Sequence, residues 1–245
     1  MANFWKIVNR VIAESDIILE VIDARLIKLT RNIEIEQKII KAGKSVIFVI
    51  NKCDLVDKDY VEKQKKHLKH SVFISAKDKL GTTMLKKRIF QVAKKYQVTV
   101  GVVGYPNTGK SSVINSLAGK AKAQVSSFSG FTRGVQIIKA GKRIRLLDTP
   151  GVIPFINKNQ AQLALLGAID VSKVKEPDLV AMELIESLDT RVQVHYGIEK
   201  SKSVDSEELL EEIAVKCKRL VSGGKPDLKS MGKIIIKDWQ KGKIR

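Results

Sequence analysis

The chain has few cysteines, comparatively few acidic residues and no long apolar run. Its two cysteines, Cys53 and Cys217, lie far apart without CxxC spacing, so the sequence suggests neither a zinc module nor a disulfide framework, and we expect two reduced thiols. No run approaches the roughly 18 uninterrupted apolar residues of a membrane span, and charges interrupt residues 1–16, where a signal peptide needs an apolar segment. We therefore expect a cytoplasmic protein without a membrane partner.

The shortage of acidic residues leaves a large positive charge. The 45 Lys and Arg residues outnumber the 26 Asp and Glu residues, which gives a formal net charge of +19. Such an excess favours a polyanionic partner, most simply nucleic acid. A lysine-rich surface of the kind found in thermophilic proteins is the alternative. With 245 residues, 44% of them hydrophobic, the chain is long enough for one α/β domain and a smaller appendage.

Strands and helices are predicted to alternate over residues 1–156, which we interpret as one domain. Apolar runs rich in β-branched residues predict strands at 17–22, 45–50, 72–74, 98–103, 135–139 and 143–147. Helical periodicity predicts helices at 3–14, 33–42, 59–69, 82–96 and 111–117, with a loop at 28–32 and a candidate mobile loop at 120–134. The alternation implies a doubly wound, mostly parallel sheet whose ligands bind at the carboxyl ends of the strands.

Residues 157–245 follow a different pattern. Strand-like runs thin out from about residue 160, and helices are predicted at 160–169, 178–188, 207–221 and 228–240. The spacing of Asp205 and Glu208 is that of a capping box, and Gly223-Gly224 predicts a helix stop. We place the domain boundary near 154–159 and expect a small all-α second domain at 157–245.

The stretch 98–112 carries the clearest motif. A strand-like run ends at Gly104, the segment GYPNTGKS occupies 104–111, and a helix-compatible stretch follows, so the spacing GxxxxGK[ST] lies between a strand and a helix. In such a phosphate loop, backbone N–H groups and a helix N-terminus surround the β-phosphate, Lys110 neutralises the β- and γ-phosphate oxygens, and Ser111 ligates Mg²⁺. A glycine-rich turn before a helix is the alternative. The motif alone predicts a nucleoside triphosphate without naming its base.

The base is predicted by Asn51-Lys52-Cys53-Asp54, which directly follows an apolar strand. The Asp54 carboxylate offers what guanine needs, an acceptor for its N1–H and its exocyclic amine. Adenine would leave that carboxylate unpaired, so discrimination should be strong. The Lys52 stem would lie along the base, and Asn51 would tie this loop to the phosphate loop. A solvated turn is the alternative interpretation of the tetrapeptide.

The segment Ser75-Ala76-Lys77 closes the next strand. There the Ala76 backbone N–H is expected to donate to the guanine O6, with Ser75 steadying the turn. An ordinary strand-to-helix loop is the alternative.

Three residues beyond the phosphate loop complete the predicted site. Asp148 ends an apolar strand and is expected to hold Mg²⁺ through a water molecule, while the Gly151 N–H approaches the γ-phosphate. Thr132, in the polar stretch 120–134, is the candidate for sensing that phosphate and completing the Mg²⁺ shell. An ordinary loop threonine is the alternative for Thr132.

Together, the segments GYPNTGKS, FTR, DTPG, NKCD and SAK resemble the full signature set of Ras-like, translation-factor-related GTPases. Their order differs, because base recognition comes first and the phosphate loop lies in the middle of the chain. This order resembles the circularly permuted GTPases, and IDAR before NKCD without a later zinc cluster resembles the YlqF/RbgA type, which is involved in large ribosomal subunit assembly. The resemblance implies a Ras-like domain with a mostly parallel six-stranded sheet, permuted in order, and a small helical C-terminal domain.

The resemblance also implies the ligands. GTP or GDP with Mg²⁺ would be held by the residues of the matched motifs, which are Asn51, Lys52, Asp54, Ser75, Ala76, Lys77, Asn107, Thr108, Gly109, Lys110, Ser111, Ser112 and Gly151, with Ser111, Thr132 and Asp148 at the metal. Asn107 matches the asparagine of potassium-stimulated GTPases and is implied to help hold K⁺; a turn-forming role is the equal alternative.

Catalysis is expected to be slow without a partner. Lys110 and Thr132 are the catalytic candidates. Val152-Ile153 stands where many such GTPases place a water-orienting glutamine, and the chain has no histidine before His67 to match the N-terminal histidine implicated in RbgA-like proteins. The residue that positions the attacking water is therefore not assigned, and neither is a role for Arg25.

The C-terminal residues suggest a nucleic-acid-binding surface. Lys229, Lys233 and Lys237 recur at i, i+4 spacing and would line one helix face, followed by Lys241, Lys243 and Arg245. Such a row suits a phosphate backbone. Trp239 would either stack on a base or pack in the core.

We therefore predict a monomeric GTPase that acts on ribosomal RNA or a precursor of the large ribosomal subunit. A switch that binds a protein effector, with hydrolysis incidental, is the alternative. Asp54 disfavours an ATP-using enzyme.

Overall fold

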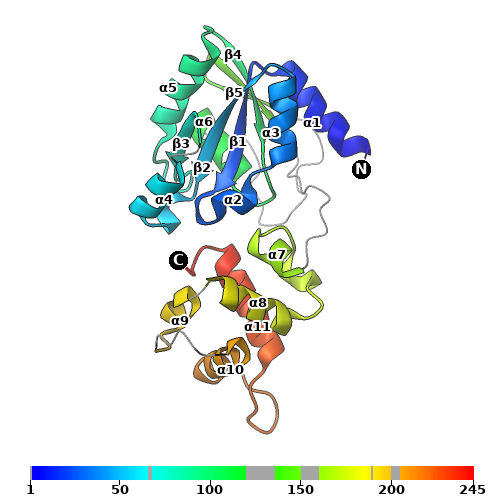
Figure 1. The fold of residues 1–245 in the computed structure, drawn as a ribbon, viewed down its shortest axis with the longest axis vertical. Helices are drawn as coiled ribbons and strands as arrows, with labels where there is room; N and C mark the ends of the chain where they lie inside the picture. Colours follow the sequence, from blue (N-terminus) through cyan, green and yellow to red (C-terminus); the bar gives the residue numbers. More distant parts are fainter. Residues whose placement is uncertain (1, 66–67, 120–135, 150–159, 189, 200–204) are drawn as a thin grey trace. The chain divides into compact units, whose positions relative to one another are not determined.

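The computed structural model describes residues 2–65, 68–119, 136–149, 160–188, 190–199 and 205–245. The chain divides into two compact units, Met1–Ile156 and Asn157–Arg245. The first contains every strand of the described chain, and the second contains helices only (Figure 1).

The first unit is built on a six-stranded sheet in the order β3-β2-β1-β4-β6-β5. Its strands are β1 Ile17–Asp23, β2 Ser45–Asn51, β3 Ser71–Ile74, β4 Val98–Val103, β5 Gln136–Ala140 and β6 Ile144–Asp148. All neighbours are parallel except β5 and β6, which form an antiparallel pair joined by a tight turn. The predicted mostly parallel six-stranded sheet is thus confirmed, with the strand before the phosphate loop in its interior.

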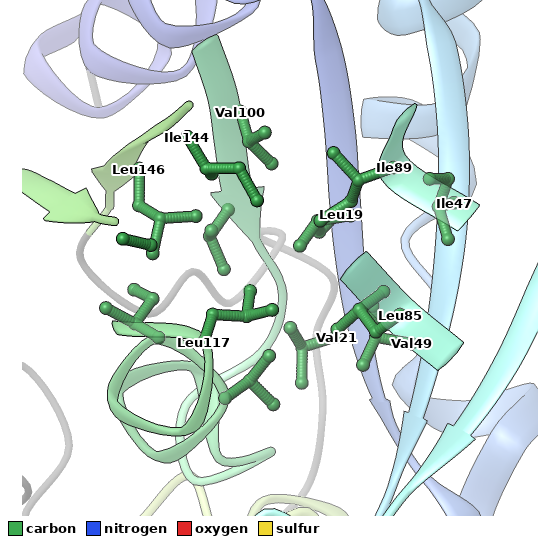
Figure 2. Packing of buried hydrophobic residues seen from close by; sticks show 14 of the residues in the cluster. Leu19, Val21, Ile47, Val49, Leu85, Ile89, Val100, Leu117, Ile144 and Leu146 are labelled. Atoms are coloured by element: carbon green, nitrogen blue, oxygen red, sulfur yellow. The ribbon is translucent and has the colours of Figure 1, made fainter. Parts of the chain in front are cut away.

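Helices cover both faces of this sheet, as its alternating side chains require. On one face, Leu19 and Val21 of β1 pack with Leu85 of α5 (Thr82–Ala93) and Leu117 of α6 (Lys110–Ala118), as Figure 2 shows. On the other face, residues of α1 (Ala2–Glu14) and α3 (Ile33–Lys41) pack around Ile18. Because β1 is buried on both faces, its residues are apolar except Glu20 and Asp23.

The remaining elements of this unit are short. They are the 3₁₀ turns η1 (Ala24–Leu26) and η2 (Cys53–Leu55) and the helices α2 (Ile27–Thr30) and α4 (Lys58–Lys65). The sequence predicts a loop at 28–32, but α2 occupies the start of this stretch, where the Thr30 hydroxyl donates to the Leu26 carbonyl at 2.8 Å. Four residues are too few to show helical periodicity, so the pattern could not reveal this turn.

The second unit packs α7 (Gln160–Leu165), η3 (Val171–Lys173), α8 (Pro177–Leu188), α9 (Thr190–Tyr196), α10 (Ser206–Lys216) and α11 (Leu228–Gln240). Gly232 lets α11 approach α8 closely, because a Cβ there would clash with the Pro177 carbonyl. Trp239 is fully buried, and its Nε1 donates to the Leu165 carbonyl at 2.8 Å. The tryptophan therefore packs in the core of this unit and does not present a stacking face for a base.

Several helix ends differ from the predicted ones. The helices predicted to run to residues 96, 169 and 221 end at Ala93, Leu165 and Lys216. A lysine with positive φ lies just beyond the first and the last of these ends, Lys94 at 51° and Lys218 at 53°. The short helix α9 is not among the predicted elements. The predicted loop 120–134 and the boundary at 154–159 lie outside the described residues. Within the described chain, no helix combines the length and apolar character needed to cross a membrane.

Candidate functional site

The predicted site residues of the first unit lie where strands of the sheet end, at their carboxyl side. Asn51 is the last residue of β2, Ser75 directly follows β3, and Asp148 is the last residue of β6. The phosphate loop follows β4 and leads into α6 at Lys110. In a parallel sheet these ends meet along one edge, where such folds bind ligands.

Two glycines of the phosphate loop allow its neighbours to approach closely. Gly104 has φ 146°, and a Cβ there would clash with the Val21 carbonyl. Gly109 has φ 96°, and a Cβ there would clash with the Asn51 side-chain amide. Asn107 also lies in the left-handed region, at φ 57°. The turn-forming role of Asn107 is therefore realised, and its predicted K⁺ contact stays a prediction.

Lys110 lies almost entirely inside the protein, with 7% of its surface exposed. Its Nζ donates to the Tyr105 carbonyl at 2.8 Å, and the same carbonyl accepts from the Thr108 hydroxyl at 3.0 Å. Burial lowers the pKa of Lys110 to about 8, against the opposing charge of Asp148. A lysine ammonium group held in this position can bind an anionic ligand such as a phosphate.

Asp148 is the matching buried anion, with 1% of its surface exposed. Burial raises the pKa of its carboxyl group to about 6, while Lys110 acts in the other direction. Among the residues that the structure describes, Asp148 Oδ1 accepts no hydrogen bond. A buried carboxylate oxygen without a donor fits a hydrated Mg²⁺ ion, and Ser111, which follows Lys110 in the first turn of α6, supplies a hydroxyl of the kind that ligates this metal.

Asn51 connects three of the predicted loops. Its Nδ2 donates to the Thr108 carbonyl of the phosphate loop at 2.8 Å, so the predicted link between these two loops is present. Its Oδ1 accepts from the Ala76 N–H at 3.1 Å. The sequence predicts that this N–H donates to the guanine O6, whereas in the structure its partner is Asn51. A guanine oxygen would have to share that donor or take it over.

The loop after β3 is held by Ser75. The Ser75 hydroxyl donates to Asp78 Oδ2 at 2.8 Å and accepts from the Asp78 N–H at 3.3 Å, as expected for a residue that steadies the turn. Lys77 is exposed, and Asp54 is half-buried in η2. Ser111 and Ser112 are half-buried in the first turn of α6.

Sequence reasoning missed a cluster of charges beside this site. Asp23, the last residue of β1, accepts from both Arg25 and Lys52. The charged residues of Asp23-Ala24-Arg25 at the end of a buried strand indicate such a cluster. The strand pattern does not show which side chain Asp23 contacts.

The predicted basic face on α11 is present. Lys229, Lys233 and Lys237 are all exposed, as are Lys241 and Arg245. Lys243 is exposed but forms an ion pair with Asp238 at 2.8 Å, so part of its charge is neutralised within the unit.

Two of the predicted site residues, Thr132 and Gly151, lie beyond the part of the chain that the structure describes. The same holds for Val152-Ile153, where the water-orienting glutamine of other GTPases would stand. Their roles stay predictions.

The proteins that this chain resembles are GTPases or GTP-binding proteins. Residues 99–215 match the family model described as 50S ribosome-binding GTPase. An uncharacterized GTP-binding protein of Methanocaldococcus jannaschii is 43% identical over 98% of this chain and 65% of its own length. Nucleolar GTP-binding protein 2 of Saccharomyces cerevisiae is 34% identical over 98% of this chain and 52% of its own length. The chain thus spans about half to two thirds of these curated relatives.

Solved structures are similar over most of the chain. The GDP-bound structure of YlqF superposes with a TM-score of 0.65 and 26% identity, covering 94% of this chain and 91% of that one. YlqF from T. maritima bound to GNP gives a TM-score of 0.64 and 25% identity, covering 94% and 89%.

Proposed function

Because this chain belongs to the circularly permuted GTPases of the YlqF/RbgA type, we propose that it binds GTP and GDP, hydrolyses GTP slowly on its own, and acts in assembly of the large ribosomal subunit. The observation that carries the proposal is the position of Asn51, whose side chain joins the loop containing Asp54 to the phosphate loop and to the loop after β3. Nucleotide recognition needs these three loops in fixed relative positions, since base and phosphates belong to one ligand.

In this proposal the base is read by Asp54. Its carboxylate accepts from the N1–H and exocyclic amine of guanine, and the Lys52 stem lies along the ring. ATP would leave Asp54 without its two donors, so GTP should be strongly preferred.

The phosphate loop would hold the phosphates and the metal. Lys110 would contact the β- and γ-phosphate oxygens, Ser111 would ligate Mg²⁺, and Asp148 would hold the metal through a water molecule. Bound Mg²⁺ would supply charge neutralisation on these oxygens. The burial of Lys110 and Asp148 supports these roles, because in a dry site both charges interact more strongly with a ligand than they would in water.

Hydrolysis is proposed to be slow without a partner. Thr132 senses the γ-phosphate, and neither Val152 nor Ile153 can orient water by a hydrogen bond from its side chain. The group that assists hydrolysis would then come from the partner, or its place would be taken by a K⁺ ion held by Asn107.

The partner is proposed to be ribosomal RNA within a large-subunit precursor. Support comes from the net charge of +19, from the exposed lysines of α11 and from the name of the matching family model. A phosphate backbone would lie along Lys229, Lys233 and Lys237.

The decisive experiment measures GTP hydrolysis by the full chain with and without large ribosomal subunits, in K⁺ and in Na⁺. The expected result is slow basal hydrolysis and a several-fold stimulation by the subunits. Stimulation by a soluble protein fraction in place of the subunits would favour an effector-binding switch, and efficient competition by ATP would contradict the role of Asp54. Equal rates in K⁺ and Na⁺ would remove the role of Asn107 in binding an ion.

A further inference from the structure

Asp23, Arg25 and Lys52 form a charged cluster joined by hydrogen bonds, and the proposed function gives Asp23 and Arg25 no role. Asp23 and Arg25 are 4% and 5% exposed. Lys52 belongs to the segment that reads the base, whereas Asp23 and Arg25 come from β1 and η1, the neighbouring strand and turn. The Cα of Asp23 is paired in register with that of Asn51, so the β1 and β2 ends lie side by side.

The Asp23 carboxylate is fixed in place from its own strand end. Arg25 binds it with two side-chain nitrogens, Nε to Oδ1 at 3.0 Å and Nη2 to Oδ2 at 2.8 Å, and the Arg25 backbone N–H donates to Oδ1 at 3.0 Å. The Asp23 N–H donates to the Thr30 hydroxyl at 3.0 Å. Both carboxylate oxygens are thus oriented before Lys52 is considered, and the planar guanidinium allows little rotation.

Lys52 is directed onto this fixed carboxylate. Its Nζ donates to Asp23 Oδ2 at 2.7 Å, and its side chain is 22% exposed. The Lys52 backbone has φ 63°, in the left-handed region, at the position that begins the turn η2.

Charge attraction contributes to this contact, since burial acts to raise the pKa of Asp23 and the charges of Lys52 and Arg25 both lower it. Arg25 already binds both oxygens of Asp23, so the carboxylate is oriented without Lys52. The contact with Asp23 fixes the ammonium group at the end of the Lys52 side chain. A lysine stem has several rotatable bonds, and it can lie flat along a base only if its ammonium group is held.

Resting on the proposed function, we propose that Asp23 is the positioning residue for guanine recognition, which holds the Lys52 ammonium so that the lysine stem forms one wall of the base site. Arg25 orients Asp23, and neither residue touches the nucleotide. The role differs from a general contribution to folding because it acts through Lys52 and only on the base end of the ligand.

The test is a double-mutant cycle on the full chain, with the dissociation constant of fluorescently labelled GDP as the readout. Asp23→Asn should weaken GDP binding about tenfold, and Lys52→Ala should weaken it at least as much. In the Lys52→Ala background, Asp23→Asn should change the constant by less than about twofold, because the group it positions is gone. Competition by tripolyphosphate, which has no base, should be unchanged by Asp23→Asn.

A matched control is Asp16→Asn. Asp16 also pairs with a lysine, Lys95, and accepts from the Thr99 N–H at 2.8 Å, but it precedes β1 at the other end of the strand. GDP binding should not change. If Asp23→Asn does not unfold cooperatively, Arg25→Lys is used in its place. This change removes the bidentate contact and keeps both Asp23 and Lys52. Its effect on GDP binding should also vanish in the Lys52→Ala background.

Equal effects of Asp23→Asn with and without Lys52, or equal losses for GDP and tripolyphosphate, would overturn the inference and leave the proposed function intact. Absence of GDP binding by the unaltered chain would overturn the proposed function and the inference together.

Discussion

The side-chain amide of Asn51 donates to the main-chain oxygen of Thr108 at 2.8 Å across 57 residues of sequence. Its oxygen accepts from the Ala76 N–H, so one buried side chain fixes three loops. Since these loops come from different strands, their relative positions depend on this residue more than on any local turn.

Replacement of Asn51 by alanine should therefore destabilise the first unit and weaken nucleotide binding together. The change leaves the Thr108 carbonyl and the Ala76 N–H without their present partner, which should lower the free energy of unfolding by roughly 2 to 4 kcal/mol. Urea denaturation and GDP titration measure the two effects. The exposed Asn9 of α1 offers a matched control, and Asn9→Ala should change neither. Unaltered GDP binding by Asn51→Ala would contradict the linking role.

Glu20 predicts an unusual pH dependence of stability. This glutamate of β1 is fully buried, accepts from the Asn32 N–H at 2.7 Å, and is faced by Glu36 and Arg31. Burial raises its pKa to about 8, with the Glu36 charge acting in the same direction. The folded state binds this proton more tightly than the unfolded state does. The stabilisation that protonated Glu20 gives the folded state is therefore complete below about pH 4.5 and is lost as the pH rises to about 8.

The variant Glu20→Gln keeps the acceptor for Asn32 and removes the ionisation. Its free energy of unfolding should therefore exceed that of the unaltered chain at about pH 9, by roughly 3 to 5 kcal/mol if the full shift is realised, and approach it at about pH 5. Chemical denaturation across this pH range measures the difference. Glu34→Gln, on an exposed residue of the same helix as Glu36, should show no such trend. Parallel pH curves for Glu20→Gln and the unaltered chain would show that the pKa of Glu20 does not change on folding.

Local patterns predicted most of the fold, because the elements that carry the sheet are short apolar strands separated by amphipathic helices. Tertiary contacts of buried polar residues were harder to predict. The strand 17–22 was expected to be buried, yet nothing in its pattern shows that Glu20 would be satisfied by the backbone of Asn32, twelve residues later. Asp23 is similar, since its partner Lys52 lies in the next strand's loop. Motif spacing predicts which loops meet, and the contacts between charged side chains depend on packing that only the structure supplies.

A change of base preference is expected for Asp54→Asn. Guanine offers two donors, N1–H and the exocyclic amine, to a carboxylate, whereas an asparagine amide presents one acceptor and one donor. Xanthine, with N1–H and a carbonyl oxygen at the neighbouring position, matches the amide. The variant should lose affinity for GDP by about 100-fold or more and gain affinity for xanthosine diphosphate. Competition titrations with both nucleotides measure the change. Similar weakening of both would place Asp54 outside the base site.

The lysine row on α11 should control binding to RNA through charge alone. The triple replacement of Lys229, Lys233 and Lys237 by glutamine keeps long polar side chains and removes three charges from one exposed helix face. If these lysines neutralise phosphates, the slope of log K against log salt should fall by about one for each lysine–phosphate pair that is removed, and binding at low salt should weaken in the same variant.

The comparison for this variant is a triple replacement of exposed lysines in the first unit, Lys69, Lys87 and Lys142, which changes the net charge by the same amount. Filter binding of large-subunit ribosomal RNA at salt concentrations from about 50 to about 300 mM, where counterion release dominates, would measure both proteins. Equal loss in both variants would mean that overall charge, and not this helix face, attracts the RNA. A selective loss of salt dependence in the α11 variant, with hydrolysis in the absence of ribosomes unchanged, is the result expected of a surface separate from the nucleotide site.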